Sequence, residues 1–589
     1  MFTSNTENNI STLSYRTIIE ALSNSPAEKL FATMWNNEDD IQSVSFGEFL
    51  EQAQAQAEYF RAHGLNRGET VILIMPQGIA LMAAFAGAML LGAVPAILAY
   101  PNFKVEPDKY RSGLEGVSAN LNARLIVIDN AFPQEMLGYV TVAEGGRLLF
   151  ASDKQKPSAQ MSLLDSAFDS EALAFIQHSA GTTGLQKGVA LSHAAVLRQL
   201  NHLAQTLQIS NQDRIYSWLP LYHDMGLIAC FILPLVYHLP VIMQSPTDWV
   251  MQPGTMLQLI TKFKCTLAWT PNFTLQFLSR RVHPDDREEF DLSSLRALIN
   301  CSEPVRAQSI DEFRKTYDSA GLKPEALQSS YAMAENVFAV TQSDIHSPPR
   351  RVWVDGERLR ERHLAGAVPA NSNGAVCFVS SGQCLPCNEV KIVSSAGKPL
   401  PDGAVGEILI SSDSLFNGYY NRPDLTEKAL QSGWYWSGDL GFLLDGELYV
   451  IGRKKDLIIV AGKNIYPQDV EEIVYTHPSI HDGRSVSLGL YNPDLGTEDI
   501  VVVAEVEKEE DLKDALSIER YLRGAIVAEL GVAVRAVYLK PPRWIVKSTA
   551  GKPARKSTCE KLLAEHPELN RMVFASGETF DDRTETANN

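Results

Sequence analysis

The sequence predicts an α/β fold: a large N-terminal domain of doubly wound mixed sheets with a small β-barrel-like part, followed by a small, mobile α+β domain. Three observations favour this fold. Strands and helical segments alternate between residues 69 and 129, turn-rich β segments fill residues 401–450, and the composition changes after residue 452. With 589 residues, 45% of them hydrophobic, the chain is long enough for at least two domains.

The first part of the chain supplies the strand and helix series. Residues 43–63 carry apolar residues at helical spacing and stop at Gly64, a favourable residue after a helix end. Residues 69–75, 96–99 and 124–129 are short apolar runs typical of buried strands. Strand, helix and strand in series indicate a doubly wound sheet.

One segment, residues 79–100, is almost wholly apolar. Gly92 and Pro95 divide it into a helix of about four turns and an extended piece, shorter than the ~20 uninterrupted apolar residues that a bilayer requires. We therefore expect a core helix and no membrane span. The N-terminus has neither a basic region nor an apolar run, so no secretory signal is expected.

Charge and cysteine content exclude other classes. The net charge of −18 argues against a nucleic-acid binder, because such proteins neutralise phosphates with Lys and Arg. Seven scattered cysteines do not make a disulfide framework, and the odd count suits a reducing, cytoplasmic location. Cys384-Leu-Pro-Cys387 has the spacing of half a zinc site, but no second Cys/His pair lies nearby in the sequence, so structural roles are favoured.

A glycine-rich loop at residues 179–188 organises the chain. The apolar run 172–176 leads into Ser-Ala-Gly-Thr182-Thr183-Gly184-Leu-Gln-Lys187-Gly, which predicts a strand opening onto a phosphate-sized loop. Glycines let backbone N–H groups approach an anion, the hydroxyls donate, and the lysine adds charge. The loop lacks the G-x-x-x-x-G-K-[ST] order, which disfavours P-loop ATPases and kinases.

This loop resembles the phosphate loop of the adenylate-forming superfamily, although Ala180 and Gln186 replace a common serine and proline. Two further loops follow predicted strands, where ligands bind in open α/β sheets. Ser302-Glu303-Pro304 resembles the adenine-contacting loop. Tyr331-Ala332-Met333-Ala334-Glu335 resembles the Tyr-Gly-x-Thr-Glu motif, with alanine in place of the glycine and the threonine. The resemblance implies that Tyr331 stacks on the base and that Glu335, with Thr183, binds Mg²⁺.

Later motifs continue the resemblance to residue 556. Asp439 in Trp-Ser-Gly-Asp matches the motif that binds the ribose hydroxyls. Arg453 is implied to reach the nucleotide, and Lys455 to act as the pivot of a hinge at 453–456. Lys552 lies in a loop that matches the superfamily's C-terminal catalytic motif, with alanine in place of a serine. The resemblance implies acyl-AMP formation from a carboxylic acid and MgATP, with Lys552, Glu335 and Arg453 as catalytic residues.

The segment Pro-Leu-Tyr-His-Asp-Met-Gly at residues 220–226 contains a His-Asp pair, but the chain has no G-x-S-x-G nucleophile elbow. The segment resembles the acyl-pocket motif of fatty acyl ligases. Amino-acid-activating relatives usually carry an acidic anchor in this region, and none is obvious here. A carboxylic acid with an apolar tail is therefore expected, in a pocket formed by His223, Asp224, Met225, Gly226, Ile228, Pro271 and Phe273.

An extra stretch at about residues 343–372 resembles the insertion that separates fatty acyl-AMP ligases from acyl-CoA synthetases. The resemblance implies transfer of the acyl group to the phosphopantetheine arm of a separate acyl carrier protein. Residues 535–561 contain eight basic residues and only one acidic residue. A basic patch formed by them would suit an acidic carrier domain, and it would suit the phosphates of CoA equally. A long-chain acyl-CoA synthetase, or a non-catalytic acyl-adenylate-binding protein, is the alternative.

The expected organisation is an N-terminal adenylation domain over residues 1–452, the hinge, a C-terminal lid domain over 457–575, and a disordered acidic tail over 576–589.

Overall fold

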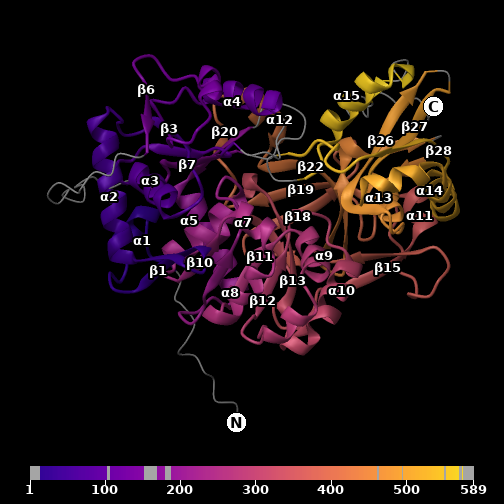
Figure 1. Cartoon of the computed structure of the whole chain (residues 1–589), viewed down its shortest axis with the longest axis horizontal. Helices are drawn as coiled ribbons and strands as arrows, with labels where there is room; N and C mark the ends of the chain where they lie inside the picture. Colours follow the sequence, from indigo (N-terminus) through magenta and orange to yellow (C-terminus); the bar gives the residue numbers. More distant parts are fainter. Residues whose placement is uncertain are drawn as a thin grey trace, which may run out of the picture.

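The computed structural model describes residues 13–101, 107–151, 169–178, 187–460, 463–493, 495–548, 552–569 and 573–574. Within these ranges two large sheets and their helices make up most of the molecule, and a smaller unit formed by the last quarter of the chain packs beside them (Figure 1).

One large sheet has the order β20-β8-β7-β4-β3-β5-β6 among the described residues. Strands β3 to β7 pair in parallel, and β8 and β20 are antiparallel additions. The predicted strand series is therefore confirmed. The strands are β3 (Thr70–Ile74), β4 (Val94–Ile97), β5 (Leu125–Ile128), β6 (Arg147–Phe150), β7 (Leu173–His178), β8 (Gly188–Ser192) and β20 (Gly418–Tyr419).

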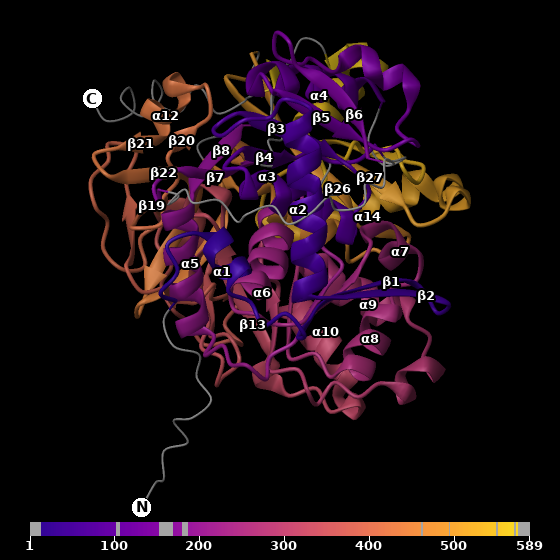
Figure 2. The ribbon, with the colours of Figure 1, turned by 90° about the vertical axis from the view of Figure 1, so that its left-hand side faces the viewer.

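Helices α2 (Phe46–Ala62) and α3 (Ile79–Leu90) lie between the two large sheets (Figure 2). Nearly all of α3 is buried, which confirms the expected core helix. The helix expected from residue 43 begins instead at Phe46. Residues 43–45 end a strand, and Ser45 caps α2 through a capping box with Glu48.

The second large sheet has the order β17-β14-β13-β12-β11-β9-β10-β1-β2. Its middle strands are parallel, and β2, β14 and β17 are antiparallel at its edges. The strands are β1 (Leu30–Asn37), β2 (Asp40–Ser45), β9 (Ile215–Ser217), β10 (Val241–Gln244), β11 (Leu267–Thr270), β12 (Ala297–Asn300), β13 (Leu327–Ala332), β14 (Ala339–Gln342) and β17 (Gln383–Cys384).

The remaining helices of the first three quarters of the chain connect these strands. Ser192, predicted as a helix cap, accepts a hydrogen bond from the Ala195 N–H at the start of α5. The helices are α1 (Ile18–Ser23), α4 (Pro107–Leu121), α5 (His193–Thr206), α6 (Leu233–Val236), α7 (Pro246–Met251), α8 (Thr255–Phe263), α9 (Asn272–Arg281), α10 (Ala307–Tyr317) and α12 (Pro423–Ala429).

A five-stranded antiparallel sheet follows, with β18 (Asn388–Val393), β19 (Gly406–Ser412), β21 (Leu430–Gln431), β22 (Trp434–Leu444) and β23 (Glu447–Arg453). Beside it lies a hairpin with its own helix, formed by β15 (Arg351–Asp355), α11 (Gly356–Arg362) and β16 (Ala375–Val379). We call residues 351–379 the insertion hairpin.

The last part of the chain begins with the short hairpin of β24 (Ile458–Val460) and β25 (Lys463–Ile465). A sheet of order β28-β27-β26-β29 then has one apolar core on each face. Its elements are α13 (Pro467–Val474), β26 (Ile480–Asn492), β27 (Thr497–Val506), α14 (Ala515–Leu530), β28 (Val534–Lys540), α15 (Arg555–Glu565) and β29 (Val573–Phe574).

Candidate active site

Two loops of the site follow neighbouring parallel strands. β12 and β13 pair in parallel, so residues 302–304 and 331–335 leave the sheet at the same edge. Ser302 has a φ of 69°, a conformation uncommon for a residue with a side chain. The Glu303 carboxylate accepts a hydrogen bond of 3.2 Å from the Phe273 N–H, which ties the first loop to the start of α9.

Tyr331, Asp439 and Arg453 form one cluster. The Tyr331 hydroxyl donates to Asp439 Oδ2 at 2.6 Å, and Arg453 Nε lies 3.4 Å from Asp439 Oδ1. Asp439 and Arg453 are cross-strand partners in β22 and β23, so the register of that hairpin sets the ion pair. Burial and the neighbouring carboxylate hold the pKa of Tyr331 well above its usual value. Asp439, more than any other neighbour, raises the pKa of Arg453.

A second cluster joins Glu335, Tyr419 and Lys187. Glu335 is 8% exposed, and the Tyr419 hydroxyl donates to its Oε1 at 2.8 Å. Lys187 Nζ stands 4.5 Å from the centroid of the Tyr419 ring, a cation–π contact. Burial lowers the pKa of Lys187, and the Glu335 carboxylate opposes that shift. The structure thus brings together a buried carboxylate and a lysine that are 148 residues apart in the sequence.

The backbone directly after Glu335 forms a strained turn centred on Val337. Val337 has φ 61° and ψ −53°, and the Phe338 N–H donates to the Asn336 carbonyl at 2.6 Å. This is a γ-turn with positive φ at its centre, which is rare and strained, especially for a β-branched residue. Such turns persist only where the surroundings fix them. Here the Asn336 amide donates to the Ala339 carbonyl at 2.9 Å.

Lys552 reaches this edge of the sheet from the C-terminal part of the chain. Its Nζ donates to the Ser302 carbonyl oxygen. Burial raises the pKa of Asp224, and the Lys552 ammonium opposes that shift. Burial, with a smaller effect of Lys552, lowers the pKa of His223 to about 4. Lys552 therefore lies between the loop at Ser302 and the predicted acyl-pocket segment.

Other groups tie the C-terminal unit to the rest. Arg306 forms an ion pair of 2.7 Å with Glu472 of α13. The predicted basic patch is only partly free, because Arg555 is buried against Glu471 and Asp456, and Lys540 pairs with Glu565 at 2.7 Å. The patch therefore presents fewer open positive charges than the sequence alone suggested.

The acyl-pocket segment leads into a π-helix over Met225–Ile232, in which every residue is buried. π-helical turns are rare and frequently mark functional sites. Asp224 accepts a 2.8 Å hydrogen bond from the Met225 N–H at the start of this turn. A side chain at Gly226 would overlap the Pro220 carbonyl, so only glycine fits there.

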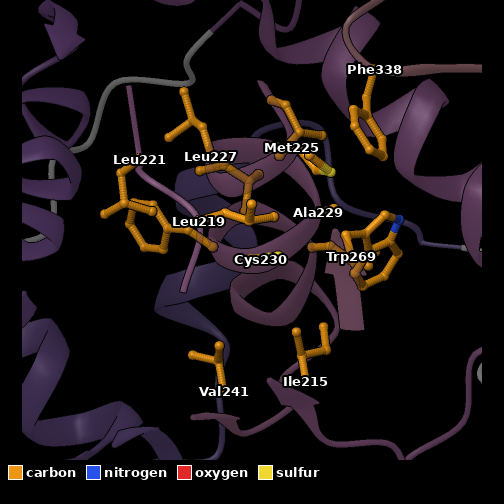
Figure 3. Packing of buried hydrophobic residues seen from close by; sticks show 14 of the residues in the cluster. Ile215, Leu219, Leu221, Met225, Leu227, Ala229, Cys230, Val241, Trp269 and Phe338 are labelled. Carbon is orange, nitrogen blue, oxygen red and sulfur yellow. The ribbon is translucent and has the colours of Figure 1, made fainter. Parts of the chain in front are cut away.

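Aromatic rings line the same region. Trp218 and Trp249 stack with their centroids 3.8 Å apart, and Phe273 meets both edge-on at 6.1 and 6.0 Å. Figure 3 shows Met225, Cys230 and Trp269 among the side chains of one buried apolar cluster, and Pro271 follows Thr270, the last residue of β11. Nothing in the sequence indicated that Trp218 and Trp249 pack beside the predicted pocket residue Phe273. Their spacing along the chain carries no signal, since they meet only through the fold.

Three predicted residues of the phosphate loop, Thr182, Thr183 and Gly184, lie outside the described residues. The predicted pivot, Lys455, is in the short 3₁₀ turn Lys454–Asp456 after β23. Burial is the largest cause of its lowered pKa, and the Arg453 guanidinium adds to it.

The insertion hairpin contacts the C-terminal unit. Val354 and Leu359 share an apolar cluster with Leu457 and Tyr466, which follow the 3₁₀ turn. The His363 ring also lies 3.3 Å from the Asn464 amide nitrogen. On its other side, the hairpin is held to α10 by a two-point ion pair between Arg351 and Asp311, at 2.7 and 2.8 Å.

Comparison with known proteins defines the class. A family profile described as "AMP-binding enzyme" matches residues 21–420, so the chain is an adenylate-forming enzyme. A curated relative from Moorena producens, a medium-chain-fatty-acid–[acyl-carrier-protein] ligase (JamA), is 30% identical over 91% of this chain and 93% of its own length. A long-chain-fatty-acid–AMP ligase (FadD32) of Mycolicibacterium smegmatis is 28% identical over 83% of this chain and 84% of its own length.

Solved structures of fatty acyl-adenylate ligases support the same class. A structure from a study of fatty acyl-adenylate ligases of E. coli and L. pneumophila has a TM-score of 0.87 and 28% identity, covering 95% of this chain and 99% of the other. The L. pneumophila fatty acyl-adenylate ligase in complex with acyl adenylate and pyrophosphate has a TM-score of 0.71 and 26% identity, covering 94% and 97%. The chain belongs to the fatty acyl-AMP ligase family of the adenylate-forming superfamily.

Among the described residues, no helix is both long enough and apolar enough to cross a membrane.

Proposed function

We propose that this chain converts a medium- or long-chain fatty acid and MgATP to fatty acyl-AMP and pyrophosphate, and then passes the acyl group to a separate acyl carrier protein. One observation supports it most: Lys552 donates to the Ser302 carbonyl at the edge of the sheet where the Tyr331–Asp439 and Glu335–Tyr419 clusters also lie. At this position the Lys552 ammonium lies near both the predicted acyl pocket and the expected position of the nucleotide.

In this proposal the fatty carboxylate attacks the α-phosphorus of ATP and pyrophosphate leaves. Lys552 neutralises charge on the carboxylate and on the α-phosphate as the new bond forms. Asp439 accepts hydrogen bonds from the ribose hydroxyls, and Arg453, paired with it, fixes its orientation. Tyr331 offers a ring face to the base, alongside the loop at residues 302–304. The C-terminal unit turns about the segment 453–456, with Lys455 as pivot.

The residues near Glu335 fit a magnesium ion. Glu335 supplies a buried hard-oxygen donor, and the Lys187 ammonium lies close enough to interact with it electrostatically. In the proposal Glu335 and Thr183 would hold Mg²⁺, which would offset the negative charge of the phosphates when bound. Tyr419 orients the Glu335 carboxylate for that purpose.

The acyl tail occupies the apolar region between the π-helix Met225–Ile232 and the segment after Trp269. The walls there are apolar and aromatic, with His223 and Asp224 at the end nearest Lys552. Each methylene that enters such a region gains about 0.8 kcal/mol, which favours long acids over short ones.

The insertion hairpin supports a carrier protein over CoA as acceptor. Its contacts with Leu457, Tyr466 and Asn464 oppose the rotation that, by family resemblance, CoA thioesterification needs. All seven cysteines are free thiols, as expected for an enzyme that acts in a reducing cytoplasm.

The test supplies ATP, dodecanoic acid and either CoA or a holo-carrier protein, and measures pyrophosphate, acyl-CoA and acyl-carrier. We expect pyrophosphate release and acyl-carrier, with little acyl-CoA. Leu359→Ala, which cuts the hairpin's contact with the cluster of Leu457 and Tyr466, should raise acyl-CoA formation. Glu357→Ala, at an exposed site on the same helix, is the matched control. Efficient acyl-CoA synthesis by the native chain would refute the acceptor assignment, and absence of pyrophosphate release would refute adenylation.

A further inference from the structure

Three side chains that can ligate a metal meet outside the residues proposed for adenylation. His202 comes from α5, Cys387 from the turn between β17 and β18, and Asp413 from the residue after β19. One ligand atom from each lies within 4.8 Å of the other two. The three residues span 211 positions in the sequence, so they meet only because the fold joins these segments.

His202 and Asp413 are already oriented toward one another. His202 Nε2 lies 3.0 and 3.1 Å from the two oxygens of the Asp413 carboxylate. The side chains are 13% and 37% exposed, so they are fixed yet open to solvent. Asp413 is held by neighbours, since the Ser414 hydroxyl donates to its Oδ1 at 2.9 Å and Arg198 Nε donates to its carbonyl at 2.7 Å. This arrangement limits the reorganisation that a bound cation requires.

Cys387 is held in an unusual turn. The Asn388 N–H donates to the Leu385 carbonyl at 3.0 Å, and Cys387 occupies the third turn position with a φ of 58°. With Pro386 before it, that position is normally filled by glycine or asparagine. The Asn388 amide also donates to the Val340 carbonyl at 3.1 Å, which anchors the turn to β14. The strained turn thus holds the thiol close to the His–Asp pair.

We propose that His202, Cys387 and Asp413 form a zinc site. Thiolate, imidazole and carboxylate are the ligand types that zinc takes in tetrahedral sites, and a water molecule would complete the fourth position. Zinc would bind His202 through Nε2, with the neutral imidazole keeping its one proton on Nδ1, and the Asp413 carboxylate would ligate through an oxygen. The Cys387 thiol releases its proton to solvent, because only the thiolate ligates.

The site would cross-link three segments of the N-terminal part. One of them leads directly to the active site: three residues beyond Asp413, the Phe416 N–H donates to the Glu335 carbonyl at 2.9 Å. Tyr419, which donates to the Glu335 carboxylate, follows in the same connection. A zinc ion at Asp413 therefore stabilises the chain segment that positions Glu335, without touching nucleotide or acid.

The experiment adds Zn²⁺ alone to the full chain, freed of metal and kept reduced without chelating reagents. Isothermal titration should give one zinc ion per chain, and zinc should raise the Tm. Each of His202→Asn, Cys387→Ser and Asp413→Asn should weaken the zinc Kd by at least about tenfold. Cys384→Ser, which alters the other exposed thiol of the same Cys-Leu-Pro-Cys segment, is the matched control and should leave the Kd unchanged.

Cobalt supplies a second readout that does not depend on stability. A thiolate-to-cobalt charge-transfer band should form in the native chain and in Cys384→Ser, and it should be absent from Cys387→Ser. The Tm of each metal-free variant shows whether it folds. No zinc binding by the native chain would overturn the proposal. Binding that survives all three ligand variants, or that is lost equally in Cys384→Ser, would also overturn it.

Discussion

Replacing Tyr419 with phenylalanine removes one hydroxyl from the buried Glu335 carboxylate and leaves the ring that contacts Lys187. The lost bond is 2.8 Å long and its acceptor is charged, so it is worth about 1.5–3 kcal/mol. Substituting a residue that orients a metal ligand typically weakens metal affinity by about 10–100-fold. As a free energy, this loss is close to the range given for the hydrogen bond. We therefore expect Tyr419→Phe to weaken the apparent Mg²⁺ affinity about ten- to hundredfold.

The assay follows ATP–pyrophosphate exchange as a function of Mg²⁺ at saturating fatty acid. Excess Mg²⁺ should restore most of the rate, because the substitution does not remove a group that touches the reacting atoms. Tyr420→Phe is the control, since the neighbouring Tyr420 packs against a different apolar core. A Mg²⁺ dependence within twofold of the native chain would refute the role given to Tyr419 and weaken the assignment of Glu335.

Three further predictions follow from burial and packing. Gly226→Ala should destabilise the chain by about 1–3 kcal/mol or more in urea unfolding, because its methyl group overlaps the Pro220 carbonyl; an unchanged midpoint would contradict this. Burial lowers the pKa of His178 to about 4. As the pH falls, this histidine is therefore protonated in the unfolded chain at a higher pH than in the folded chain. The stability from this group is complete above about pH 6.5 and falls by about 3 kcal/mol as the pH drops to 4, a slope that His178→Gln should reduce. For the substrate, kcat/KM should rise by up to about fourfold per methylene from short to medium acids, and equal activity on acetate and dodecanoate would disprove the acyl pocket.

Local patterns predicted much of the fold. The apolar runs of β3, β4, β5 and β7 and the core helix α3 follow from short-range periodicity and from glycine and proline positions. Residues 302–304 and 331–335 were also predicted to follow strands, and the structure brings these loops to one edge because β12 and β13 are parallel.

Contacts set by tertiary structure were beyond the sequence. Tyr419 was part of a turn-rich β segment, and nothing local showed that its hydroxyl meets a carboxylate 84 residues earlier. The Trp218–Trp249 stack has the same origin. Cys387 was interpreted as structural because no histidine lies near it in the chain, yet His202 and Asp413 meet it in space. The π-helix at Met225–Ile232 was equally unpredictable, since an all-apolar run fits any buried helix.

The central claim is that Lys552 carries the positive charge of the adenylation step. The most direct measurement is the single-turnover rate of acyl-AMP formation by Lys552→Ala, with Lys556→Ala on the following helix as control. Losing one preorganised donor costs about 10²–10³ in rate, so we expect a fall of at least about 100-fold while the Tm stays near that of the native chain. A folded Lys552→Ala variant that forms acyl-AMP within threefold of the native rate would contradict the account.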